Sequence, residues 1–411
     1  MHTDDAKPQT DSVPATLSHS AQERGRRFPL NHQLLAKACQ TTFWLITCFV
    51  ATPTVGLGQT PEAHFRKGGA NFRDTPPEQR LYWQSHIEQS HRRILEAADR
   101  AKGKGIATVL GSGVGIEIPL AELARRFDRL ILVDMDGPSM LESLEQVPLQ
   151  LRSKVELRVM DITSFATTLM ERLRDATDAS STAEEAFRRY DTIFNELNLG
   201  NPVNLPTSDL VVSSLVLSEV PRAPFTYTTR LLQARFGIPL ETWAGFDRAF
   251  EKLMLLAVED HVRLLALLSR SGGVVYYSDS LARGPAYGQF SPETRTAVEA
   301  NVLADFQRLG LAESADAVGL VVGRLCRGEY PIKTEIEAYE RLLATYRHAG
   351  DNAFEPLLPI AEVLRQFERR GFAVQGAPQS WWWLSYPCAI SHQAPGGFIV
   401  SSWIFNRSGF E

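Results

Sequence analysis

Three closely spaced glycines, and an aspartate nineteen positions after the last of them, have the residue types and spacing of a ligand-binding turn. Gly111, Gly113 and Gly115 follow an apolar run that predicts a strand. Without a Cβ, glycine lets the backbone turn sharply and approach a ligand closely. Asp134 ends a second apolar run, and a carboxylate at that place can accept hydrogen bonds from both hydroxyls of a ribose. The pattern therefore predicts a site for an adenosine-containing cofactor.

The segment after the glycines predicts a helix over residues 116–127. The free N–H groups and the positive dipole end at its start would face an anionic group in the turn. The dinucleotide pattern Gly-x-Gly-x-x-Gly/Ala needs a small residue where this chain has Ile116. The spacing Gly-x-Gly-x-Gly instead resembles the first motif of class I S-adenosylmethionine-dependent methyltransferases.

Four further segments match the strands of that family in the expected order. Leu132 to Leu141 is similar to the second strand and the helix start after it, with Asp134 at the ribose-binding acid. Val155 to Ile162 is similar to the third strand, with Asp161 at the residue that contacts the adenine amino group. Asp209 to Val220 and Ser271 to Asp279 are similar to the fourth and fifth strands. Five elements in order make the resemblance specific.

The resemblance implies a Rossmann-like α/β fold, with a seven-stranded, mostly parallel sheet and helices on both faces. It also implies S-adenosyl-L-methionine as the cofactor. The residues that it places around this cofactor are Gly111, Ser112, Gly113, Gly115, Glu117, Asp134, Met135, Asp161, Ile162, Ser214 and Tyr82.

One position departs from the family. An acidic residue that binds the methionine amine commonly stands two positions before the first glycine, and this chain has Val109 there. Glu117 is a substitute for it, with the alternative that Glu117 only complements the dipole of the following helix. Tyr82 belongs to a predicted helix over residues 76–102, which in the family often lies over the cofactor; core packing is the alternative role for this tyrosine.

Methyl transfer from a sulfonium is an in-line displacement, so the main task of the protein is to align the reactants. A base is needed only when the acceptor carries a proton at the working pH. Glu219, directly after the fourth strand, and Tyr227 in the following segment are the candidate catalytic residues. A helix-start carboxylate and a packed aromatic are the alternative roles for them. No metal site is predicted.

Composition limits the partners. The chain has 411 residues, of which 22% are charged, and its formal net charge is −5. It therefore has no overall positive charge that would attract the phosphate backbone of a nucleic acid. Its four cysteines are scattered without a Cys-x-x-Cys pair, which indicates neither zinc nor a disulfide framework. The apolar run Phe43 to Ala51 is too short to span a bilayer. We therefore expect a cytoplasmic protein without membrane contact.

The expected organisation is an N-terminal extension over residues 1–70 and a methyltransferase domain over residues 71–411. The extension is expected to be disordered at first and then helical over 31–50. Insertions at about 163–208, 221–270 and 284–356 would form a large helical cap, which serves as a lid or in a homodimer.

Four functions remain open at this point. The first is methylation of a small-molecule acceptor on an undetermined O, N or C atom. The second is methylation of a peptide or protein, for which the insertions would form a groove. The third is a nicotinamide-dependent oxidoreductase, which Ile116 disfavours. The fourth is a non-catalytic partner protein that keeps the fold, which the missing acid at Val109 leaves open.

Overall fold

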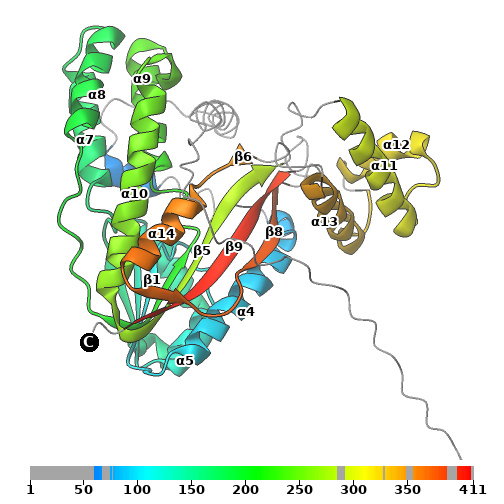
Figure 1. Ribbon diagram of the computed structural model, residues 1–411, viewed down its shortest axis with the longest axis horizontal. Coiled ribbons are helices and arrows are strands. Elements are labelled where there is room, and N and C mark those ends of the chain that lie inside the picture. Colours follow the sequence, from blue (N-terminus) through cyan, green and yellow to red (C-terminus); the bar gives the residue numbers. More distant parts are fainter. Residues whose placement is uncertain are drawn as a thin grey trace, which may run out of the picture.

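A computed structural model describes residues 60–66, 75, 77–284, 292–326, 329–348, 355–386 and 396–408. Within these residues one sheet of nine strands organises the molecule (Figure 1). Seven strands follow one path in the order β3-β2-β1-β4-β5-β9-β7, while β6 pairs with β5 and β8 pairs with β9. The strands are β1 (Ile106–Leu110), β2 (Arg129–Asp134), β3 (Val155–Val159), β4 (Ser208–Ser214), β5 (Ser269–Gly284), β6 (Glu355–Pro356), β7 (Phe372–Val374), β8 (Gln379–Tyr386) and β9 (Gly396–Arg407).

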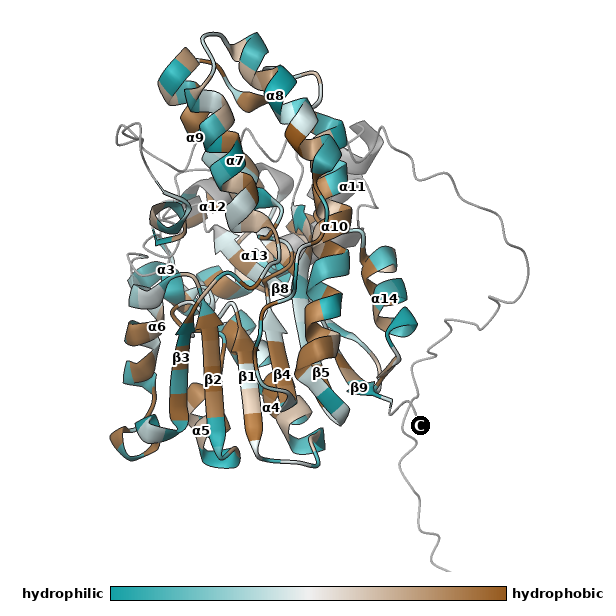
Figure 2. Ribbon diagram, turned by 90° about the vertical axis from the view of Figure 1, so that its left-hand side faces the viewer, coloured by the Kyte–Doolittle hydropathy of each residue, from teal (hydrophilic) through white to brown (hydrophobic). Residues whose placement is uncertain are grey.

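The sheet is mostly parallel, as the sequence predicted. Strands β3, β2, β1, β4 and β5 pair in parallel, and β9 pairs antiparallel with both β5 and β7. Figure 2 shows the first strands of this row side by side and largely hydrophobic. The expected seven-stranded Rossmann-like sheet is therefore confirmed as the main path, with β6 and β8 added to it.

Two helical layers cover the sheet, because its central strands are apolar on both faces. On one face, Leu210 and Val212 of β4 pack with α4 and α5. On the other face, Val211 packs with α7, α10 and α14. The α-helices are α3 (Pro77–Leu81), α4 (Gln84–Arg100), α5 (Leu120–Arg126), α6 (Gly137–Ser143), α7 (Ala166–Asp178), α8 (Ala183–Glu196), α9 (Arg222–Phe236), α10 (Phe246–Leu268), α11 (Pro292–Arg308), α12 (Ala315–Cys326), α13 (Ile332–His348) and α14 (Ile360–Arg369).

The helix predicted to begin at residue 116 begins later. α5 starts only at Leu120, and residues 116–118 form turns in which the Ile118 N–H donates to the Gly115 carbonyl. Pro119 stands at the N-cap and disfavours helical backbone in the residue before it. The predicted helix start at residue 116 was therefore wrong, and α5, with seven residues, is too short to provide an anion site at its N-terminus.

The tryptophan-rich segment near the end of the chain forms β8, which pairs with β9. β7 and β8 both pair antiparallel with β9, β7 at its carboxyl end and β8 over its amino-terminal half. The chain bends between them at Gly376, whose φ is +83°. In β8, Trp381 and Trp383 lie on one face, as alternation in a strand requires. Both rings contact the same side chain of α4, His86.

The helices of the segments 163–208, 221–270 and 284–356 pack in two groups. α7, α8, α9 and α10 share one apolar cluster with the sheet. α11, α12 and α13 share a second cluster with the start of α4 and with β8 and β9. Figure 1 shows the two groups on opposite sides of the carboxyl ends of the strands. No helix in the described part of the chain is long and apolar enough to cross a membrane. The helix predicted over 31–50 lies outside the described residues.

Candidate functional site

The three glycines of the turn have left-handed backbone conformations but different surroundings. Their φ angles are +64° at Gly111, +47° at Gly113 and +70° at Gly115. A Cβ at Gly111 would lie 2.6 Å from Val216, and one at Gly115 would lie 2.8 Å from Leu120. Among the described residues, a Cβ at Gly113 would meet nothing within 4 Å. Gly111 and Gly115 therefore serve close packing, whereas Gly113 borders open space in which a ligand could lie.

Asp134 lies at the carboxyl end of β2 beside Gly113. Its Oδ2 accepts a hydrogen bond of 2.9 Å from the Gly113 N–H, and its Oδ1 accepts one of 2.8 Å from the Asp136 N–H. These two bonds use two of the roughly four acceptor sites of a carboxylate. Burial raises the pKa of Asp134, and the N–H donors partly oppose this shift. The side chain is thus held in place, with acceptor capacity left for hydroxyl groups.

Ser112, the residue before Gly113, has a buried hydroxyl. Its Oγ has no hydrogen-bond partner among the described residues. A buried hydroxyl without a partner costs free energy, which a polar ligand atom could recover. The open space at Gly113, the spare acceptor sites of Asp134 and the hydroxyl of Ser112 together fit an adenosine-containing group.

Asp161 is engaged more fully than the resemblance implied. Its Oδ1 accepts hydrogen bonds from the N–H and hydroxyl of Thr163, and its Oδ2 accepts them from the N–H and hydroxyl of Thr167. Four donors match the roughly four acceptor sites of the carboxylate. An adenine amino group would have to displace one of them. Met135 lies beside Thr167, and Ile162 packs against the neighbouring core.

Glu117 lies in the turn before α5, not inside the predicted helix. Its Oε1 is 3.0 Å from Nε2 of His86, which is 1% exposed in α4. The side chain of Glu117 itself is 21% exposed. Nearby, Nε2 of His91 lies 3.1 Å from the Ile116 carbonyl oxygen. Two histidines of α4 therefore contact the turn, one through a side chain and one through the backbone.

Tyr82 is tied to the second helical group. Its hydroxyl donates to Oε2 of the buried Glu335 in α13, and its ring packs edge-on against Tyr339. Burial raises the pKa of Tyr82, so this hydroxyl stays protonated. Tyr82 shares its apolar cluster with Ile116 of the turn. The structure thus brings Tyr82 to the edge of the site as part of a packed layer.

The exit of β4 is braced by a buried carboxylate. Asp279, in β5, accepts hydrogen bonds from the N–H groups of Leu217, Ser218 and Ser280 at 2.8–3.3 Å. Burial raises the pKa of Asp279 to about 7, although these donors oppose the shift. Leu215 has a φ of +56° in the same loop, which is a strained value for leucine. Asp279 holds this strained loop in place.

Ser214 and His261 line the two faces of the same strand end. The Ser214 hydroxyl lies 3.1 Å from that of Ser278. Nε2 of His261 lies 2.8 Å from the Ser213 hydroxyl on the opposite face of β4. Burial lowers the pKa of His261 to about 4, so its ring is neutral at pH 7. His261 therefore has a packed, structural role in α10.

The two candidate catalytic residues lie in contrasting places. Glu219 is 63% exposed and pairs with Arg222 at the start of α9. Tyr227 is 1% exposed in a small cluster with Met170, Leu231 and Phe65. Burial raises the pKa of Tyr227, which opposes a role as a base. The structure does not bring either side chain into contact with the glycine turn.

No protein-family model and no curated protein matches the chain. The solved structures to which it is similar include the N-methyltransferase NodS from Bradyrhizobium japonicum WM9 with S-adenosyl-L-homocysteine. That match is 11% identical over 85% of this chain and 100% of that one, with a TM-score of 0.34.

Two further solved structures are similar to the same degree. An O-methyltransferase family protein from Burkholderia thailandensis is 12% identical over 92% of this chain and 71% of that one, with a TM-score of 0.34. The [4+2]-cyclase SpnF is 9% identical over 77% of this chain and 80% of that one, with a TM-score of 0.32. Scores this low carry no argument about activity, so function has to be argued from the site.

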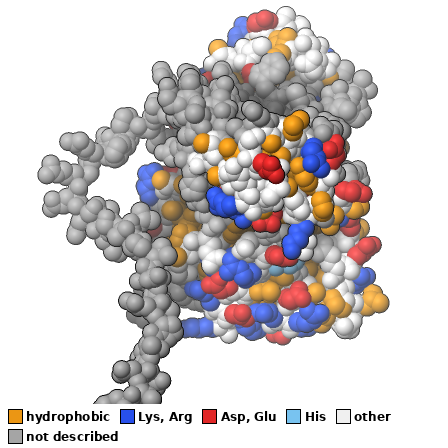
Figure 3. Space-filling model, turned by 90° about the vertical axis from the view of Figure 1, so that its right-hand side faces the viewer, with side chains coloured by type: hydrophobic (Ala, Val, Ile, Leu, Met, Phe, Trp, Pro, Cys, Tyr) orange, Lys and Arg blue, Asp and Glu red, His pale blue; other side chains and the backbone are white. Residues whose placement is uncertain are grey.

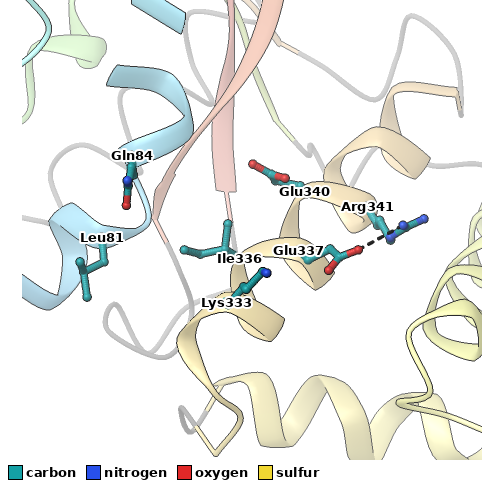
Figure 4. Close-up of a pocket in the computed structure, with 7 residues that line it drawn as sticks. All are labelled: Leu81, Gln84, Lys333, Ile336, Glu337, Glu340 and Arg341. Carbon is teal, nitrogen blue, oxygen red and sulfur yellow. Dashed lines mark hydrogen bonds and ion pairs between the residues drawn. The ribbon is translucent and has the colours of Figure 1, made fainter. Parts of the chain in front are cut away.

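A groove lies between α3, the start of α4 and α13 (Figure 4). It has a volume of about 660 Å³. Its lining combines apolar and charged side chains, which are Leu81, Gln84, Lys333, Ile336, Glu337, Glu340 and Arg341. Figure 3 shows acidic and basic side chains interspersed on one face of the molecule. Among the described residues no cluster of three or more His, Cys, Asp or Glu side chains could hold a metal ion.

The sequence reasoning missed two features of the site. It did not assign a bracing role to Asp279, although the place of this residue after buried apolar residues allows one. It also gave no reason to connect Trp381 with His86, because these residues are far apart in sequence. The indole Nε1 of Trp381 donates to Nδ1 of His86 at 2.8 Å. Only the pairing of β8 with β9 brings Trp381 to α4.

Proposed function

We propose that this chain is an S-adenosylmethionine-dependent methyltransferase that acts on a small-molecule acceptor. The observation that carries the proposal is the position of Asp134 beside Gly113, at the carboxyl ends of the central strands. Ligands of open α/β sheets bind at this edge, where the strand order reverses. β1 is that point here, because it lies between β2 and β4.

The sheet favours this cofactor over a nicotinamide dinucleotide. The dinucleotide fold usually has a sixth parallel strand beside the fifth. In this chain the antiparallel β9 occupies that position. Ile116 also lacks the small side chain that the dinucleotide pattern needs. Both observations support S-adenosylmethionine, which when bound supplies an activated methyl group on a sulfonium sulfur.

The residues of the chain would mainly position the reactants. Asp134 binds the ribose, Ser112 and Gly113 form the floor under the adenosine, and Met135 and Ile162 border the adenine. Asp161 shapes this end of the site through its bonds to Thr163 and Thr167. The β4 exit loop, braced by Asp279, forms the acceptor side. Alignment of this kind lowers the barrier chiefly by avoiding an entropy cost.

The acceptor determines whether a base is needed. An acceptor that already carries a free lone pair needs none, because methyl transfer then requires only alignment. For a protonated acceptor, Glu219 remains the candidate base, since it follows the β4 exit loop directly. We also propose that the scaffold begins near residue 71 and that the segments 163–208, 221–270 and 284–356 are insertions that surround the acceptor.

A peptide acceptor is the second candidate, favoured by the groove between α4 and α13. Its two apolar and four charged side chains suit an extended peptide of mixed character. Because the groove is lined by one of the insertions, it would add specificity without changing the cofactor site. A screen of both acceptor classes separates these two alternatives.

Calorimetric titration tests the cofactor assignment. Wild-type protein should bind S-adenosylmethionine and S-adenosylhomocysteine with micromolar affinity and should not bind NAD(P)H. Asp134→Ala should weaken binding of both sulfur ligands by roughly 10-fold or more, since it removes hydrogen bonds to a charged group. Asp128→Ala is the matched control, because Asp128 is exposed just before the opposite end of the same strand. Wild-type protein that binds neither sulfur ligand would refute the proposal and leave a non-catalytic partner protein.

A further inference from the structure

The turn that carries Glu117 is held by a buried histidine with a defined tautomer. Nδ1 of His86 accepts the indole N–H of Trp381 at 2.8 Å. An indole nitrogen can only donate a hydrogen bond, so Nδ1 carries no proton. In the neutral ring the proton is therefore on Nε2, which lies 3.0 Å from Oε1 of Glu117. The contact of β8 with α4 thus places the protonated nitrogen of this ring near the carboxylate.

The orientation of this histidine is fixed from a second direction. The ring of His86 stacks on Trp383, with centroids 4.7 Å apart and planes 13° from parallel. Trp383 in turn packs edge-on against Trp83, and His86 is 1% exposed. A ring enclosed in this way cannot rotate without displacing the indoles. Its Nε2 makes no hydrogen bond of good geometry, so its contact with Glu117 is electrostatic and the carboxylate can still accept other donors.

Glu117 has the position and charge to bind a cation. It is 21% exposed, and His86 is the partner that the described residues provide for it. Glu117 lies two residues after Gly115 and therefore at the turn that borders the proposed cofactor. The chain has Val109 in place of the acid that the resemblance would place before Gly111. Because Asp134 is assigned to the ribose, Glu117 is the acidic side chain that remains at this turn for the amine of the cofactor.

We propose that His86 is a positioning residue for Glu117, and that Glu117 binds the ammonium group of the amino-acid end of S-adenosylmethionine. The inference rests on the proposed function. Trp381 and Trp383 have a supporting role, because they fix the tautomer and orientation of His86. These two tryptophans thus affect ligand binding through His86 and Glu117, without stacking on the ligand themselves.

Two ligands that differ only in the amine test this inference. One is S-adenosylhomocysteine, and the other is its deamino analogue, in which hydrogen replaces the ammonium group. Calorimetry gives the ratio of their dissociation constants, which isolates the contribution of the ammonium group. Wild-type protein should prefer S-adenosylhomocysteine by roughly 10-fold or more, as expected for a hydrogen bond between charged groups. Glu117→Gln should reduce the ratio to within about threefold of one.

Variants of the supporting residues separate positioning from stability. His86→Phe keeps the ring on Trp383 but removes both nitrogens, and it should lower the ratio to an intermediate value. Trp381→Phe removes only the N–H donor and should act in the same direction to a smaller extent. His91→Gln is the matched control, because His91 contacts the same turn through the backbone of Ile116. It should leave the ratio unchanged, even if both affinities fall.

The outcomes distinguish this inference from the proposed function. If His86→Phe and Trp381→Phe weaken both ligands equally, His86 has only a structural role and the inference is overturned. If Glu117→Gln keeps the wild-type ratio, the amine binds elsewhere, which also overturns it while the cofactor assignment stands. Wild-type protein that binds neither ligand refutes the proposed function and this inference together. Should His86→Phe fail to fold, the ratios for Trp381→Phe and Glu117→Gln decide.

Discussion

Asp134 and Asp279 occupy comparable places in the sheet but have different surroundings. Each follows apolar residues of a parallel strand, in β2 and β5. Asp134 accepts two backbone hydrogen bonds and keeps acceptor sites beside the open space at Gly113. Asp279 is 0% exposed and accepts bonds from three backbone N–H groups of its own surroundings. Position in the fold therefore does not distinguish a binding carboxylate from a bracing one; exposure and existing partners do.

The largest expected effect on stability is at Asp279. Asp279→Ala leaves the N–H groups of Leu217, Ser218 and Ser280 without their acceptor, and each costs about 1–3 kcal/mol when buried. We expect a loss of roughly 3 kcal/mol or more in the free energy of unfolding, measured by denaturant titration. Asp279→Asn should be intermediate, because its amide retains one acceptor. A stable Asp279→Ala protein with normal cofactor binding and no turnover would instead make Asp279 a reacting group.

The free energy of unfolding should also depend on pH, because His261 is buried in α10. Burial lowers the pKa of His261 from 6.5 to about 4, so the unfolded chain binds its proton more readily than the folded one. The neutral ring therefore stabilises the fold above pH 6.5, and this stability is lost as the pH falls towards 4. The loss should be on the order of 3 kcal/mol, since each pKa unit corresponds to about 1.4 kcal/mol.

Denaturant titrations of the wild type and His261→Gln at several pH values measure this contribution. The variant should lack this part of the acid sensitivity. If the free energy of unfolding changes equally with pH in the two proteins between pH 6.5 and 4, folding does not lower the pKa of the ring.

Alanine substitutions at two glycines of the turn test whether the ligand lies beside Asp134. Gly113→Ala and Gly115→Ala share a left-handed backbone, which costs alanine about 1–2 kcal/mol. Only Gly115→Ala creates a close contact, because its Cβ would lie 2.8 Å from Leu120. Its free energy of unfolding should therefore be lower than that of Gly113→Ala by a further ~1–3 kcal/mol. Gly113→Ala should instead weaken binding of S-adenosylhomocysteine more than its modest instability explains. Calorimetry and thermal unfolding of both variants measure this. Equal affinity in the two variants would mean that the ligand does not lie against Gly113.

The smallest effect is expected at Glu219. This side chain is 63% exposed and pairs with Arg222, and exposed ion pairs contribute little to stability. Glu219→Gln should change the free energy of unfolding by less than about 0.5 kcal/mol. With an acceptor that needs no base, it should change turnover by less than about threefold. Arg222→Gln is the control for the ion pair. A fall in turnover of roughly 100-fold or more at Glu219 alone would establish it as the base.

The elements were predictable to the extent that local pattern determines them. The apolar runs before Gly111 and Asp134 predicted β1 and β2. The start of α5 was predicted four residues too early, because the effect of Pro119 was not considered. The two helical groups were not separable from sequence, since nothing local indicates which cluster an apolar helix joins.

The sequence by itself determined the glycine turn, the acid at the end of the second strand and the order of the sheet elements. These features depend on backbone conformation and on alternation of apolar residues, which neighbouring residues control. Only the tertiary structure decided that Asp161 is fully bonded, that Asp279 is a brace and that Glu117 faces His86. Those roles depend on burial and on partners such as Trp381, distant in sequence, which the pairing of β8 with β9 brings to α4.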